Sequence, residues 1–241
     1  MKKIIVSLIC PLLFPLLAFA EPIELPVVKK GDSWVYRLTT EKEPNVWVQQ
    51  FTEYTVMLSD TSSILLGMRE KDSQQELKGE LVGRDWSKAR SVNGKEKIVN
   101  QPFQFPLEPG KSWKVQYTEL HPNKVHRREQ FRHNYTVIGW EEVDVGAGHF
   151  LAIKVESEGK WKAELEPSVS DPGERPERRN VPGEDPRSRE ANLKVVSGRL
   201  YKAFWYVPKV KRWVKSIEEY YNAEGICNER YTSELEWFKV Q

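Results

Sequence analysis

The fold class follows from the stretch Pro109-Gly110-Lys111-Ser112-Trp113-Lys114-Val115-Gln116-Tyr117. A glycine turn precedes a serine and a tryptophan, and apolar residues then alternate with polar ones. This alternation with a period of two is typical of a half-buried strand. The stretch repeats an earlier one, Gly31-Asp32-Ser33-Trp34-Val35-Tyr36. The same signal therefore predicts the start of a strand at two places in the chain.

A second pair of matching segments follows the first pair. Gln50-Phe51-Thr52-Glu53-Tyr54-Thr55-Val56 comes after the first copy, and Gln130-Phe131-Arg132-His133-Asn134-Tyr135-Thr136-Val137 comes after the second. Both pairs are separated by roughly 80 residues, as expected for an internal repeat. We expect a single β-rich domain, 21–241, built of two related halves, 31–100 and 110–241. A chance match of short motifs is the alternative.

The first twenty residues have the pattern of a secretory signal peptide. Lys2 and Lys3 precede the apolar run from Ile4 to Phe19, and Ala18-Phe19-Ala20 forms a cleavage site of the A-x-A kind. We expect cleavage after Ala20, no membrane span in the mature chain, and a soluble protein in the periplasm. A retained anchor and a lipoprotein attached at Cys10 are weaker alternatives.

Removal of the signal peptide balances the charge of the chain. The signal peptide holds two of the 37 Lys and Arg residues and none of the 35 Asp and Glu residues, so 35 of each remain. Proteins that bind phosphate backbones carry a basic excess or a clustered basic face, and we therefore expect no nucleic-acid partner. Cys227 is the single thiol of the mature chain, which excludes an intramolecular disulfide. We expect a monomer.

The mature chain is predicted to be mostly antiparallel β-structure. Val46 to Leu58 and Val125 to Val145 are long stretches rich in β-branched and aromatic residues, and Asn93-Gly94 predicts a hairpin turn. A stiff segment, Pro102 to Gly110, should cross the sheet in an extended conformation because its prolines forbid a regular helix or a central strand. No segment shows convincing helical spacing.

Two further stretches allow predictions, one about which side chains face the core and one about disorder. In Phe150 to Glu158, we expect Leu151, Ile153 and Val155 to face the core and Ala152 to face the other way. The segment 164–192 contains five prolines, mixed Arg and Glu, and almost no large apolar residue, so we expect a mobile, disordered insertion. It is interpreted as a bare loop or as a segment that binds a partner.

Four segments together resemble a family of exported β-sheet domains of unknown function, some of them called TapB-like. They are Gly31 to Tyr36, Phe105 to Trp113, Val145 to Val155 and Phe204 to Lys215. The resemblance implies an all-β fold with a curved antiparallel sheet, similar to the half-barrels of periplasmic lipoprotein carriers. It carries over no catalytic residue, and the 164–192 insertion departs from the pattern.

The usual motifs of catalysis are absent from the sequence. There is no Gly-x-Ser-x-Gly, phosphate loop, Cys-x-x-Cys or His-Glu-x-x-His. We therefore expect no catalytic residues, no cofactor and no metal, and we interpret His121, His126 and His133 as scattered surface residues. A glycan hydrolase that uses Glu141 and Asp144 is the alternative, and it requires carboxyl groups about 5–10 Å apart.

An aromatic hairpin near the end of the chain is the best candidate for a binding site. Aromatic and cationic residues are dense there, and consecutive aromatic residues must point to opposite sides of a strand, so one side could line a groove unless both are covered. The predicted ligand-binding residues are Phe204, Trp205, Tyr206, Lys211, Arg212, Trp213 and Tyr221.

This composition suits an amphipathic ligand with an anionic group, such as a lipid, an acylated chain or a glycan. The sequence therefore predicts a non-catalytic envelope protein that binds or carries such a ligand, or an envelope partner protein, on a curved sheet. A structural assembly factor is a further alternative.

Overall fold

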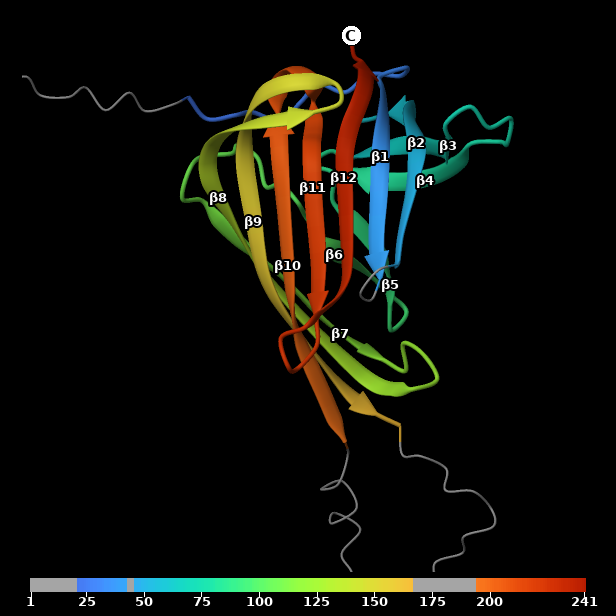
Figure 1. Ribbon diagram of the computed structural model, residues 1–241, viewed down its shortest axis with the longest axis vertical. Coiled ribbons are helices and arrows are strands. Elements are labelled where there is room, and N and C mark those ends of the chain that lie inside the picture. The colour runs from blue at the N-terminus through green and yellow to red at the C-terminus, as the bar shows by residue number, and fades with distance from the viewer. Residues whose placement is uncertain (1–20, 43–45, 167–193) are drawn as a thin grey trace, which may run out of the picture.

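The computed structural model describes residues 21–42, 46–166 and 194–241 (Figure 1). The predicted signal peptide, 1–20, and most of the predicted insertion, 164–192, lie outside these ranges. The strands are β1 (Ser33–Lys42), β2 (Val46–Ser59), β3 (Ser63–Glu70), β4 (Lys78–Gly83), β5 (Lys88–Val92), β6 (Lys95–Asn100), β7 (Ser112–Leu120), β8 (His126–Val145), β9 (Gly148–Leu165), β10 (Val195–Val207), β11 (Arg212–Tyr221) and β12 (Cys227–Lys239).

Ten of these strands form one antiparallel sheet in the order β4-β3-β2-β1-β12-β11-β10-β9-β8-β7. The sheet curves strongly, and β4 and β7 are its two edges (Figure 1). Strands β5 and β6 form a separate hairpin, joined through the turn Asn93-Gly94 as predicted. The predicted all-β fold with a curved antiparallel sheet is confirmed. Within the described ranges, we find no helix with the length and apolarity needed to cross a lipid bilayer.

The two copies of the repeated motif begin their strands with the same turn. Gly31 has a φ of 90° and Gly110 a φ of 86°, a left-handed conformation that glycine adopts without strain. The N–H of Gly31 donates to the carbonyl of Val56 over 2.9 Å, and the N–H of Gly110 donates to the carbonyl of Val137 over 2.8 Å. The acceptors are the equivalent valines of the second matching segments.

Each turn is followed by the same cross-strand aromatic pair. Trp34 of β1 lies opposite Tyr54 of β2, and Trp113 of β7 lies opposite Tyr135 of β8. The second pair is stacked, with ring centroids 5.4 Å apart. Cross-strand aromatic pairs stabilise antiparallel sheets, so the repeated sequence produces the same local structure in two parts of the sheet.

The proline-rich segment 102–110 packs on the inner face of the sheet, where it contributes to the core. The side chain of Phe103 is fully buried, and its ring contacts the rings of Phe204, Tyr206 and Trp213 at centroid distances of 5.0–6.2 Å. Leu107 forms an isolated bridge with Ile23. The segment therefore covers the sheet without joining it, as its prolines predict.

The predicted faces of Phe150 to Glu158 are partly wrong. Leu151 is 57% exposed, whereas Ala152 is fully buried. The reason is that the turn between β8 and β9 folds back over β12: the N–H of Ala147 donates to the carbonyl of Leu235 over 2.9 Å, and the ring of Phe150 packs on Phe238. The side of β9 that was expected to be solvated is therefore covered at this end.

The end of β9 overlaps the predicted start of the insertion at Glu164. Strand β9 continues to Leu165, whose N–H donates to the carbonyl of Lys194 over 2.9 Å. Strand β10 then begins at Val195. The charged ends of these strands lack the apolar alternation on which the prediction depended, and pairing with neighbouring strands maintains them.

Candidate ligand-binding groove

The residues predicted as a binding site lie mostly in the packed interior. Phe204, Trp205 and Tyr206 of β10 and Arg212 of β11 are all buried. Phe204 and Trp205 point to opposite sides of β10, and both sides are covered. The indole of Trp205 lies between two lysines on neighbouring strands, with the Nζ of Lys154 at 5.0 Å and the Nζ of Lys215 at 6.0 Å from the ring centroid.

Arg212 occupies a cage of aromatic rings. Its guanidinium carbon lies 4.3–5.4 Å from the centroids of five rings, those of Trp34, Tyr36, Tyr54, Trp86 and Trp213. Its Nε and Nη1 atoms are buried and have no hydrogen-bond partner among the described residues. Stacking on ring faces stabilises a weakly hydrated guanidinium, so Arg212 and Trp213 belong to the core of the sheet in this structure.

Lys211 and Tyr221, the remaining predicted site residues, lie at opposite ends of β11. The Nζ of Lys211 forms an ion pair with Asp32 over 3.0 Å, and the ring of Tyr221 lies under the guanidinium of Arg199 at 4.3 Å. The seven residues therefore do not converge on one surface. A ligand-binding role for them remains a prediction.

A different part of the molecule is hollow. A groove of about 1490 Å³ is lined by residues of strands β7, β8, β9 and β10. Its floor contains Tyr117, Phe131, Trp161 and Gly198, one from each strand, and these residues are cross-strand neighbours in the sheet register. The β5–β6 hairpin and the turn 222–225 form its walls.

The floor is an aromatic platform. The rings of Tyr117 and Phe131 are stacked with centroids 4.9 Å apart, and the indole of Trp161 continues the row. Gly198 allows this arrangement, because a Cβ atom there would lie 2.5 Å from the Nε1 atom of Trp161. The three rings are only partly buried, so they can contact an apolar group placed in the groove.

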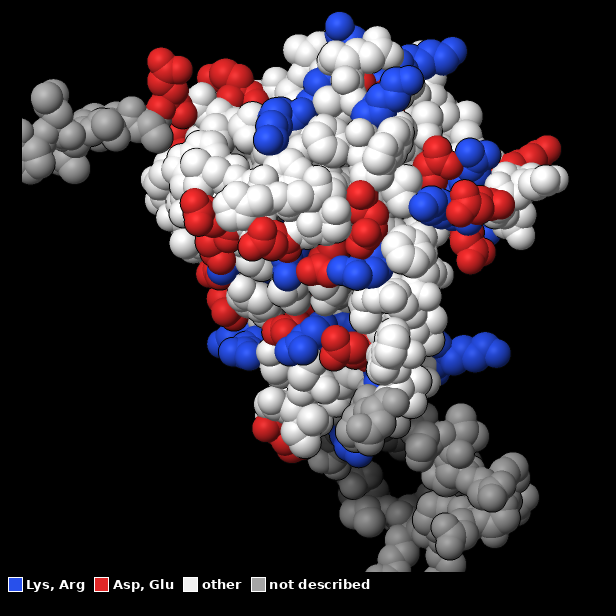
Figure 2. All heavy atoms as spheres, turned by 45° about the horizontal axis from the view of Figure 1, so that its top comes forward, with Lys and Arg blue, Asp and Glu red and all other residues white. Residues whose placement is uncertain are grey.

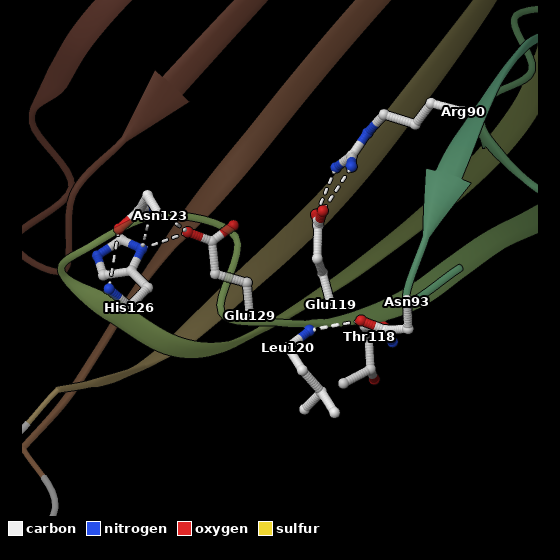
Figure 3. Close-up of polar contacts among 8 residues, drawn as sticks. All are labelled: Arg90, Asn93, Thr118, Glu119, Leu120, Asn123, His126 and Glu129. Atoms are coloured by element: carbon white, nitrogen blue, oxygen red, sulfur yellow. Dashed lines mark hydrogen bonds and ion pairs between the residues drawn. The ribbon is translucent and has the colours of Figure 1, made fainter. Parts of the chain in front are cut away.

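Side-chain contacts fasten the β5–β6 hairpin to strand β7, as Figure 3 shows. The guanidinium of Arg90 donates two hydrogen bonds to the carboxylate of Glu119, at 2.7 and 2.6 Å. The side-chain amide of Asn93 donates to the carbonyl of Thr118 over 2.9 Å and accepts the N–H of Leu120 over 2.8 Å. Asn93 thus bonds the edge of β7 as a neighbouring strand would, which fixes the height of the hairpin above the floor.

The charged residues that line the groove are all basic. They are Lys95, Lys97, Arg132, Lys160, Lys162 and Arg199. Among the residues that the structure describes, no Asp or Glu lines it. The last four alternate with the floor residues along their strands, so their side chains leave the opposite face, whereas the two lysines belong to the hairpin wall.

The face of the molecule seen in Figure 2 has a different charge pattern. Basic and acidic side chains gather there in mixed rows across the strands. Ion pairs also join basic and acidic residues on neighbouring strands of the sheet, for example Lys215 with Glu234 over 2.9 Å and Arg37 with Glu234 over 2.6 Å. Charge is therefore compensated across these strands, in contrast to the groove.

A buried polar cluster lies in the sheet between the groove and the aromatic core. The Nζ of Lys202 forms an ion pair with Glu218 over 2.9 Å, and the Coulombic attraction of Lys202 holds the pKa of the Glu218 carboxyl below its usual value despite burial, which would raise it. His133 is buried nearby. Burial and the positive charge of Lys202 lower the pKa of His133 to about 4, so its imidazole is neutral at pH 7. The interpretation of His133 as a surface residue is wrong.

The carboxylates of the hydrolase alternative do not share a pocket. Glu141 forms an ion pair with Lys154, and Asp144 forms one with His149. They lie three positions apart along β8, so their side chains leave opposite faces of the strand. Within the described ranges, no group of three or more His, Cys, Asp or Glu residues is placed to hold a metal ion.

The sequence analysis missed the groove residues Trp161, Lys95 and Lys97. Tyr117 and Phe131 belong to the repeated segments, but their role could be identified only after β7, β8 and β9 had been aligned. One signal in the sequence could have indicated the floor of the groove. Phe131, His133 and Tyr135 alternate along β8 and therefore lie on the same face of the sheet.

Comparison with known proteins identifies no family for the chain. No protein-family model matches it, and no curated protein matches it at a significant level. The chain is similar to several solved structures, three of which are described here. A Bacteroides fragilis protein classed as exported, with a YmcC-like fold, has 14% identity and a TM-score of 0.42 over 90% of this chain and 99% of its own.

The other two structures are of proteins classed as lipoproteins. One, from Parabacteroides distasonis, has 14% identity and a TM-score of 0.43 over 91% of this chain and 100% of its own. The other is the hypothetical lipoprotein YmcC from Escherichia coli, with 10% identity and a TM-score of 0.34 over 83% of each chain. TM-scores below 0.5 show only a partial likeness of shape. Nothing in these comparisons confirms the predicted membership of a TapB-like family.

Proposed function

We propose that the chain is a non-catalytic binding protein of the periplasm that holds an amphipathic ligand in the groove between the sheet and the β5–β6 hairpin. The observation that carries the proposal is the partly exposed aromatic row of Tyr117, Phe131 and Trp161 at the base of a groove of about 1490 Å³. Ligand sites are concave and mostly apolar with a few polar groups. The signal-peptide pattern of residues 1–20 supports the location.

Native mass spectrometry of the protein purified from its own host would test the proposal. We expect an additional mass that is released by organic solvent and belongs to an amphiphile. Trp161→Ala should reduce the retained fraction at least several-fold, because stacking and apolar contact on the floor would be lost. Trp237→Ala is the matched control, since Trp237 is exposed and lies outside the groove.

Two results together would contradict the proposal. The first is a wild-type protein free of any additional mass, and the second is failure of that protein to bind added amphiphiles of any head group. Equal loss of ligand in Trp161→Ala and Trp237→Ala would also contradict it, because the groove would then not be the site. Circular dichroism and urea unfolding of both variants would show that the fold is retained.

A further inference from the structure

We infer that the β5–β6 hairpin makes the groove selective for ligands with an anionic head group, and that Lys95 and Lys97 are the specificity-determining residues. This inference rests on the proposed function, because it concerns the same groove. It adds the charge class of the ligand and the direction in which the ligand lies. The apolar part contacts the aromatic floor, and the anionic group lies at the hairpin.

The register of the hairpin places both lysines on the side that faces the floor. Lys95 pairs with Val92, and Lys97 pairs with Arg90. Residues directly opposite each other in an antiparallel pair project from the same face. Val92 is buried, and the guanidinium of Arg90 lies 5.6 Å from the ring centroid of Tyr117. The face that carries Lys95 and Lys97 is therefore the face turned toward the floor.

The two lysines also differ from Arg90 in their charge compensation. Arg90 is neutralised by the carboxylate of Glu119, shown in Figure 3. Lys95 and Lys97 form no ion pair with any described residue, and both are exposed. Two ammonium groups without a counter-charge on one wall create a local positive potential, which extends about 8–10 Å at physiological ionic strength.

The chemistry of the groove then selects the ligand. A carboxylate or a phosphate monoester attached to an apolar chain would place its charge against the lysines and its chain on Tyr117, Phe131 and Trp161. A cationic head group would be repelled by the same wall, and a neutral head group would gain only the apolar contact. A binding site whose charge is opposite to that of its ligand gains more in selectivity between ligands than in affinity for any one of them.

Calorimetric titration with four amphiphiles of one chain length would test the inference. The probes are dodecanoate, dodecyl phosphate, dodecyl maltoside and dodecyltrimethylammonium, each below its critical micelle concentration. We expect the two anionic probes to bind about tenfold or more tightly than the neutral one, which corresponds to about 1.4 kcal/mol. The cationic probe should bind most weakly, and the anionic advantage should fall as salt is added.

The decisive variant is Lys95→Glu/Lys97→Glu. It should remove the preference for anionic probes and leave the affinity for dodecyl maltoside within about twofold, since the floor is unchanged. The control is Lys78→Glu/Lys114→Glu, which makes the same change in net charge at exposed lysines outside the groove and should keep the preference. The milder Lys95→Gln/Lys97→Gln gives the same test if charge reversal disturbs the hairpin.

The outcomes separate this inference from the proposed function. If dodecyl maltoside and the anionic probes bind equally well to the wild type, and the lysine variants change nothing, the inference is wrong but the groove remains the site. If both double variants lose the preference equally, net charge rather than the hairpin is responsible, and the inference is again wrong. If no probe binds, the proposed function itself fails. A difference between dodecanoate and dodecyl phosphate shows which anionic group the lysines favour.

Discussion

At the scale of single residues, His133 makes the stability of the folded protein depend on pH. Its imidazole is buried, and Lys202 adds a positive charge nearby, so the pKa in the folded protein is about 4. In the unfolded chain the pKa returns to the ordinary value near 6.5. Between these values the unfolded state binds more protons than the folded state. Stability therefore falls as the pH is lowered through this window.

We predict that His133→Gln weakens this dependence on pH. Between pH 7 and pH 5, the wild type should lose about 2 kcal/mol more of its free energy of unfolding than the variant, because glutamine does not titrate. Urea unfolding at the two pH values measures the difference. The interval from pH 7 to pH 5 lies above the ordinary pKa of a glutamate carboxyl, so Glu218, whose pKa is lowered in the folded protein, contributes little to this difference.

The control for this prediction is His149→Gln. His149 is exposed, and its hydrogen bond to Asp144 raises its pKa, so its contribution has the opposite sign: it stabilises below the unfolded pKa and is lost as the pH rises. The control should therefore keep the acid sensitivity of the wild type. Identical pH profiles for the wild type and His133→Gln would show that His133 is not the responsible group.

At the scale of elements, the repeated turn is the clearest link between sequence and structure. Gly110 adopts a φ of 86°, and a Cβ atom there would meet nothing within 4 Å. Any cost of adding a methyl group at this position must therefore come from the backbone conformation alone. The turn matters because it sets where β7 begins and hence where Tyr117 meets Phe131 in the floor of the groove.

We predict that Gly110→Ala lowers the free energy of unfolding by about 1–2 kcal/mol, the cost of a left-handed conformation for a residue with a side chain. Gly79→Ala is the matched control. Gly79 lies in β4 without a positive φ, and its Cβ would make only an ordinary contact, so the change should be neutral or slightly stabilising. Equal effects in urea unfolding would exclude backbone strain as the cause.

The elements themselves were largely predictable from sequence. The long strands, the Asn93-Gly94 turn and the extended segment 102–110 follow from alternation, turn chemistry and proline content, which act over a few neighbouring residues. The groove could not be predicted in the same way. Its floor combines Tyr117, Phe131 and Trp161 from three strands, and its wall depends on Asn93 bonding to β7. Such contacts depend on register and on the curvature of the whole sheet.

The aromatic hairpin shows the same limit on prediction from sequence. Alternation correctly predicted that Phe204 and Trp205 point to opposite sides of β10. It could not show that segment 102–110 covers the first side and that the folded-back turn between β8 and β9 lies over part of the other side. Burial of these residues depends on segments about 60 to 100 positions away in the sequence.

At the scale of the whole molecule, the position of a strand in the sheet decides how much its side chains contribute to the free energy of unfolding. Strand β12 lies between β1 and β11, in the middle of the ten-stranded sheet, whereas β4 is an edge. Leu235 of β12 is fully buried, and Leu81 of β4 is 64% exposed. The same residue type therefore has two different environments.

We predict that Leu235→Ala costs about 3 kcal/mol of stability, as is usual when a buried leucine is truncated and a cavity remains. Leu81→Ala should change the free energy of unfolding by no more than about 0.5 kcal/mol. Urea unfolding of both variants under the same conditions measures the contrast. A loss of similar size in both would mean that the burial of Leu235 does not set its contribution to stability.

The central place of β12 also governs the order of events during biosynthesis. The chain is made from its N-terminal end, so β1 is complete long before β12, its neighbour in the sheet, has been translated. Until then one edge of β1 is unpaired and open to incorrect pairing. The sheet can therefore be completed only after nearly the whole polypeptide has emerged.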